Sequence, residues 1–192
     1  MTISTLAVLP SSQTSDQKSR DFYRRDLIPL MPEALWKIES GIVRTMTWNQ
    51  EGNQISLGYW GVGDVIGQPL SRLDPFQVEC LTPVRVSLIP PQEWSHELDS
   101  ILSHIQQAQE LHSIVQTQST DLRLLNFLNW LAKKFGNATE LGLLIDVRLT
   151  HLEIADVIGI TRVSVTRMMQ KLERKGIILR PRRHCIILKS AQ

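Results

Sequence analysis

The sequence has few cysteines and no grouping of them that a metal or a disulfide framework would need. Cys80 and Cys185 are the two cysteines of the 192-residue chain, and neither belongs to a CxxC pair or a His/Cys cluster. Disulfide scaffolds, structural zinc sites and iron–sulfur clusters all require such groupings. We therefore predict two reduced thiols, no metal site and no cofactor.

Long apolar runs are also absent. No stretch approaches the roughly 18 apolar residues of a membrane-spanning helix, and residues 1–10 lack the basic start and long apolar segment of a secretion signal. Hydrophobic residues make up 42% of the chain and charged residues 21%, which is ordinary for a globular protein. We expect a cytoplasmic protein that buries a core.

The chain as a whole has little excess of either charge, but basic residues are concentrated at the carboxyl terminus. The net charge is +2, yet from Arg148 onward ten basic residues face three acidic ones. A basic quarter on a nearly neutral chain favours a polyanionic partner for that quarter. A merely solvated helix face is the alternative on charge alone.

The first half of the chain predicts a small β domain. Residues 11–20 are polar and lack apolar periodicity, so we interpret residues 1–25 as a flexible lead-in. Residues 26–93 contain short runs rich in valine, isoleucine and tryptophan, separated by glycine and proline. These runs predict strands of an antiparallel β-roll at 35–39, 42–48, 54–60, 78–81 and 85–89.

Residues 94–119 predict one long helix with an apolar stripe. A spacing of alternately three and four residues is typical of a helix that pairs with another helix. We predict a dimer interface, with packing of the stripe on the roll of its own chain as the alternative. The stripe consists of Leu98, Ile101, Ile105, Ala108, His112 and Val115.

Residues 120–192 predict a winged helix-turn-helix. A helix over 120–134 has one apolar face and ends at Gly136. Thr150 and Glu153 form a capping-box sequence that opens a second helix, and Gly159 provides a turn before Thr161, which can cap a third. Beyond the third helix, two apolar runs joined by a basic turn predict a wing.

The third helix, over residues 162–175, has one core face and one face of hydrogen-bond donors. Val165, Met168, Met169 and Leu172 share the core side. Arginine forks suit guanine in the major groove, and an exposed valine suits a thymine methyl group. The predicted base contacts are Arg162, Val163, Thr166 and Arg167. The predicted backbone or flanking contacts are Thr150, Thr161, Ser164, Gln170, Arg174, Arg180, Arg182 and Arg183.

The stretch LTHLEIADVIGITRVSVTRMMQKLERKGII at 149–178 resembles the winged helix-turn-helix of the CRP/FNR family of bacterial transcription regulators. Its TRV-x-VTR pattern is most similar to that of the family's nitrogen regulators, the NtcA group. GDVIG at 63–67 and LTPVRVSLIP at 81–90 resemble the family's β-roll sensor more weakly. The resemblance implies an α+β fold with a cyclic-nucleotide-binding-like roll, and a homodimer that binds a palindromic operator and acts on RNA polymerase. It also implies base contacts by Arg162 and Arg167, with Val163 where many relatives have glutamate.

The sensor region departs from the family's cyclic-nucleotide pattern. Gly67 is followed by Gln68 and Pro69 rather than by glutamate, and Arg72 is followed by Leu73 rather than by serine or threonine. We therefore do not expect cyclic AMP binding, and no arginine near 76–82 supports 2-oxoglutarate. The effector stays unassigned.

The sequence as a whole predicts a sequence-specific DNA-binding transcription regulator. Its five histidines accompany no nucleophile or paired-carboxylate motif, so we do not expect an enzyme. The alternative is a protein-docking adaptor with only weak, nonspecific affinity for DNA.

Overall fold

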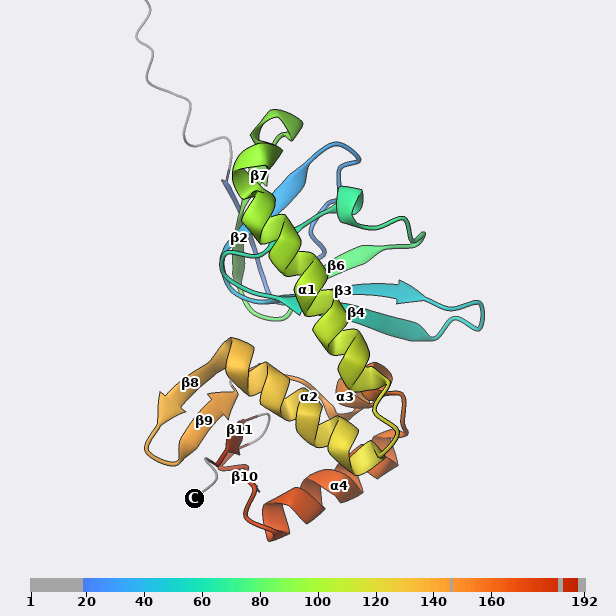
Figure 1. The fold of residues 1–192 in the computed structure, drawn as a ribbon, viewed down its shortest axis with the longest axis vertical. Coiled ribbons are helices and arrows are strands. Elements are labelled where there is room, and N and C mark those ends of the chain that lie inside the picture. Colours follow the sequence, from blue (N-terminus) through green and yellow to red (C-terminus); the bar gives the residue numbers. More distant parts are fainter. Residues whose placement is uncertain (1–18, 146, 183–184, 190–192) are drawn as a thin grey trace, which may run out of the picture.

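The computed structural model describes residues 19–145, 147–182 and 185–189. A β-roll lies at one end and a helical domain with a small sheet at the other, and the long helix α1 (Leu98–Val115) runs across the roll toward the helical domain (Figure 1). This is the predicted α+β arrangement. Among the described residues, no helix combines the length and apolar character that a membrane crossing requires.

The roll consists of two antiparallel sheets. One has the order β1-β7-β2-β5 and the other β4-β3-β6. Large side chains from both sheets, such as Trp36, Ile38 and Trp60, fill the space between them. The predicted strands are therefore confirmed. The bounds are β1 Ser19–Phe22, β2 Leu35–Ser40, β3 Val43–Trp48, β4 Gln54–Trp60, β5 Val65–Ile66, β6 Gln77–Cys80 and β7 Val84–Ile89, with short 3₁₀ helices η1 at Gln68–Leu70 and η2 at Pro91–Glu97.

The prediction of a flexible lead-in up to residue 25 is wrong for its last part. Ser19–Phe22 forms β1, which pairs antiparallel with β7 from Ser19↔Ser87 to Phe22↔Val84. Most side chains of this edge strand are exposed, so its sequence carries no apolar alternation. Its backbone hydrogen bonds to β7 hold it in the sheet. Residues 1–18 lie outside the described part of the chain.

Helix α1 divides the predicted apolar stripe between two faces. Ile101, Ala108 and Val115 pack against the cores of their own chain. Leu98 and Ile105 are 55% and 48% exposed, beside Leu102 at 47%, and His112 is also exposed. Half of the predicted stripe therefore also packs within the chain, because α1 lies along the roll, and the dimer interface stays a prediction.

The helical domain contains a four-stranded antiparallel sheet of order β10-β11-β9-β8 beside three helices. The predicted helices and wing strands are present. The hairpin of β8 and β9 was not predicted from the sequence, because β8 is polar and largely exposed. The bounds are α2 Thr120–Phe135, β8 Gly136–Thr139, β9 Gly142–Ile145, α3 His151–Ile158, α4 Arg162–Arg174, β10 Ile178–Leu179 and β11 Ile186–Leu188.

The two domains share a hydrophobic core. Tyr59 of β4 and Leu81, which follows β6, belong to the same buried cluster as Phe127 of α2 and Ile154 of α3. The ring centroids of Tyr59 and Phe127 are 5.9 Å apart. The roll therefore directly supports the helices that carry the predicted DNA site.

Candidate nucleic-acid interface

Helices α3 and α4 are joined by the predicted turn and are capped by the predicted threonines. The Thr150 hydroxyl accepts a hydrogen bond from the Glu153 N–H at 3.1 Å, and the Glu153 carboxylate accepts from the Thr150 N–H at 2.6 Å. Gly159 has a φ of 67°, a left-handed conformation that favours glycine. Thr161 caps α4 by accepting from the Ser164 N–H at 3.1 Å. These bonds fix the angle at which α4 leaves α3.

The outer face of α4 carries the predicted donors and one apolar side chain. Arg162, Arg167, Gln170 and Arg174 are exposed, and Val163 is 59% exposed. The opposite face packs on the domain core: Val165 and Met169 are fully buried, and Met168 and Leu172 are partly buried. The predicted division of α4 into a core face and an outer face is confirmed.

Thr166 occupies a different position from the other predicted base contacts. Its hydroxyl donates to the Arg162 carbonyl at 3.0 Å and lies 2.8 Å from Nδ1 of His151, on α3. Thr166 therefore connects the two helices, a role that the spacing along α4 did not predict.

The wing is attached to α4 by an ion pair. Arg180, just after β10, donates from Nε to Glu173 of α4 at 3.0 Å, and its Nη2 also contacts this carboxylate. This arginine lowers the pKa of the Glu173 carboxyl. Arg182 is exposed, and Arg183 lies outside the described residues. Of the two wing arginines in the described residues, Arg180 is therefore paired with a carboxylate, whereas Arg182 is exposed.

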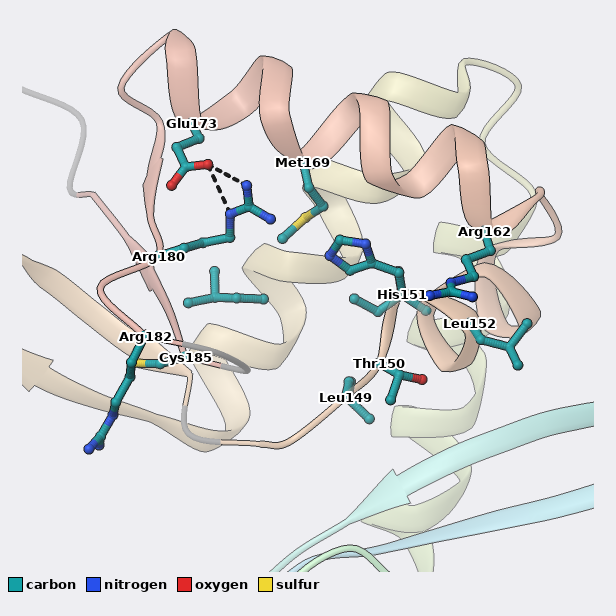
Figure 2. A pocket seen from close by; sticks show the side chains of 12 residues that line it. Leu149, Thr150, His151, Leu152, Arg162, Met169, Glu173, Arg180, Arg182 and Cys185 are labelled. Atoms are coloured by element: carbon teal, nitrogen blue, oxygen red, sulfur yellow. Dashed lines mark hydrogen bonds and ion pairs between the residues drawn. The ribbon is translucent and has the colours of Figure 1, made fainter.

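A groove of about 660 Å³ separates the wing from the two helices. It brings together Thr150, Arg162, Arg180 and Arg182 from three elements, together with His151. Figure 2 shows Arg180 turned toward Glu173, and Arg162 at the opposite end of α4. Three of the predicted arginines therefore line one groove, where Glu173 is the acidic residue among the lining side chains.

The cysteines and acidic residues offer no competing metal chemistry in the described part of the chain. Within it, no group of three or more histidine, cysteine or acidic side chains is placed to hold a metal ion. Both cysteines are buried, and burial raises the pKa of the Cys80 thiol to about 12. A thiol in that state is a poor nucleophile and a poor ligand at neutral pH.

Comparisons with known proteins identify the domain and the family. Residues 122–192 match the Crp-like helix-turn-helix domain. The chain is 41% identical over 168 residues to the regulatory protein CysR of Synechococcus elongatus, with 85% of this chain and 81% of CysR covered. The protein belongs to the CRP/FNR family. As a member of that family it is a DNA-binding transcription regulator, as the sequence predicted, and its relatives are regulators rather than enzymes. The comparisons do not favour the alternative adaptor.

Other CRP/FNR relatives agree. The global nitrogen regulator of S. elongatus is 28% identical over 163 residues, covering 76% of this chain and 73% of that regulator. A crystal structure of a CRP-family transcriptional regulator from Thermus thermophilus superposes with a TM-score of 0.75 at 25% identity, covering 89% of this chain and 92% of the other. The predicted similarity to the nitrogen regulators is confirmed, although CysR is more similar to this chain.

Proposed function

We propose that the protein binds a palindromic operator as a homodimer, with α4 of each subunit in the major groove of one half-site. The observation that carries this proposal is the outer face of α4. There Arg162 and Arg167 are exposed and form no ion pair within the described residues, and Val163 is exposed between them. A free arginine fork and an exposed methyl group are what base readout in the major groove requires.

The residues of the interface have different roles in this proposal. Arg162, Val163 and Arg167 contact bases, and Gln170 and Arg174 contact the flanking bases or phosphates. Thr150, Thr161 and Ser164 hold the helix ends through the caps described above and leave α4 correctly oriented. Arg182 contacts phosphate, while Arg180 fixes the wing through Glu173. Thr166 supports the site through His151 rather than as a primary base contact.

The dimer interface that we propose is the exposed side of α1. Leu98, Leu102 and Ile105 follow a spacing of four and three residues, and all three are about half exposed. Apolar residues at that spacing suit a parallel pair of helices. Two subunits joined there carry two recognition helices, as a palindrome requires. Contact with RNA polymerase is part of the proposal, since a transcription regulator acts through it.

Titration of an operator duplex with the variant Arg167→Ala tests this function. Removing one bidentate base contact costs about 1–3 kcal/mol of binding free energy and relaxes selectivity at one base position. Arg72→Ala is the matched control, since it removes the same charge from an exposed residue of the roll. Equal affinity of wild type and Arg167→Ala for all duplexes would contradict the proposal.

A further inference from the structure

Lys134, near the end of α2, makes polar contacts across the domain boundary. Its Nζ lies 2.8 Å from Oδ2 of Asp64, which precedes β5 in the roll. It also donates to the Tyr59 carbonyl at 2.6 Å and to the side chain of Gln107 on α1. The Lys134 and Asp64 side chains are 16% and 10% exposed. One buried ammonium thus joins the helical domain, the roll and the long helix.

Aromatic rings surround the same ammonium. The Lys134 Nζ lies 4.8 Å from the ring centroid of Trp60, 5.6 Å from that of Trp130 and 5.2 Å from that of Phe135. A cation within about 6 Å of a ring face is attracted to it, and more strongly where water is excluded. Trp60 belongs to the roll, whereas the other two rings belong to α2. The aromatic contacts therefore also join the two domains.

Hydrogen bonds from other groups also hold the Asp64 carboxylate in place. Its Oδ2 accepts from the Gly61 N–H at 2.7 Å, and its Oδ1 accepts from Nε2 of Gln107 at 2.8 Å. A carboxylate held by several donors gives the ammonium one defined position. Burying such a pair is no efficient way to gain stability, since an apolar pair of similar size does as well. The pair instead fixes the orientation of the helical domain relative to the roll, because its hydrogen bonds are satisfied in one geometry.

A second ion cluster joins the same two domains elsewhere. Arg44 of β3 lies 2.6 Å from Glu79 of β6 and 3.7 Å from Glu153, the capping-box residue of α3. The helical domain is thus attached to the roll at the end of α2 and at the start of α3. Two separate attachments oppose rotation of one domain against the other.

We infer that Lys134 is a positioning residue for DNA binding, which sets the orientation of the helical domain so that both recognition helices of a dimer reach their half-sites together. The inference rests on the proposed homodimer. The two half-sites of a palindrome lie about 34 Å apart. Binding of one recognition helix raises the affinity of the second helix for its half-site only if the dimer holds the two helices in the matching orientation. Lys134 is not on α4, so contact with a single half-site does not depend on it.

The test compares two duplexes, a palindromic operator and the same length of DNA with one half-site scrambled, at fixed salt. We expect Lys134→Met to lower affinity for the palindrome about 10- to 100-fold, and affinity for the single half-site less than about twofold. Lys134→Arg keeps the cation and should recover most of the palindrome affinity. Lys133→Met removes the same charge from the adjacent exposed residue and should leave both affinities near wild type.

Asp64→Asn repeats the test from the roll and leaves the sequence of the DNA-binding domain intact. It should weaken palindrome binding as Lys134→Met does, and the double variant should lose little more than either single one. This variant decides the matter if Lys134→Met does not fold.

The outcomes separate this inference from the proposed function. Unchanged palindrome affinity in both Asp64→Asn and Lys134→Met would overturn the inference and leave the proposed function standing. Equal losses on both duplexes would also overturn it, because they would indicate a general structural role. Failure of the wild type to prefer the palindrome would instead contradict the proposed function.

Discussion

The basic side chains of the DNA-binding site and those of the domain boundary have opposite surroundings. On α4, Arg162 and Arg167 are exposed and no ion pair within the described residues holds them. At the boundary, Arg44 is buried and Lys134 is partly buried, and both contact carboxylates of the roll. Exposed cations without an acidic partner can replace their bound water with DNA phosphates or bases. Cations that are paired with carboxylates instead hold the pairing groups in one geometry. Basic side chains are therefore available for recognition on α4 and are engaged in holding the domains together at the boundary.

The largest effect should come from breaking the Arg44 cluster. Arg44→Met leaves Glu79 and Glu153 without their shared cation, at side-chain exposures of 11% and 12%. Removing one partner of a buried ion pair costs about 3–5 kcal/mol of unfolding free energy, which urea denaturation measures. Arg85→Met breaks an exposed pair with Asp21 and is the control. A similar midpoint for both variants would contradict the comparison.

A change on the free face of α4 should alter selectivity and leave stability unchanged. Val163→Glu introduces the residue that many CRP/FNR relatives have at this position. A carboxylate accepts from the cytosine amino group and loses the contact to a thymine methyl group, so the preference at one base pair should change by about 1–3 kcal/mol. Selection from randomised duplexes measures it. Identical selected sites for variant and wild type would show that Val163 does not face a base.

Thr166 distinguishes recognition from orientation within α4 itself. Thr166→Val removes the hydroxyl that meets Arg162 and His151 but keeps the side-chain shape. We expect a loss of about 1 kcal/mol of unfolding free energy and no change in base preference. Parallel denaturation and duplex selection check both parts. Unchanged stability with a new base preference would restore Thr166 as a base contact.

The smallest effect concerns the stack of His104 on Trp60, whose ring centroids lie 3.7 Å apart. Burial lowers the pKa of His104 from its ordinary value of 6.5. The folded protein therefore binds this proton less readily than the unfolded chain does, and the unfolding free energy falls as the pH drops below 6.5. His104→Gln should flatten that fall, as denaturation between about pH 7.5 and pH 5.5 would measure. A steeper fall in the variant would contradict this assignment.

Local patterns predicted the DNA-binding helices well because the necessary information lies within each helix. The apolar periodicity around Val165, the cap at Thr161 and the glycine turn each involve neighbours within a few residues. Strand β1 was not predicted because its partner, β7, lies far along the chain. The ion pair between Arg44 and Glu153 was not predicted for the same reason.

The candidate site shows the same limit at the level of single residues. Helical spacing grouped Thr166 with the exposed donors of α4, but it could not reveal that His151 contacts the hydroxyl from α3. Nor could spacing divide the α1 stripe, because the orientation of α1 on the roll decides which of Ile101 and Leu102 is covered. Contacts between elements therefore needed the structure.

Selection of genomic fragments by the purified protein, followed by footprinting, tests whether the protein reads a palindromic operator. We expect enrichment of one palindromic sequence with two protected half-sites about 10 base pairs apart. We also expect this enrichment to be lost when Arg162 and Arg167 are both changed to alanine. Fragments without a shared palindrome, or the same fragments bound equally by the double variant, would contradict it.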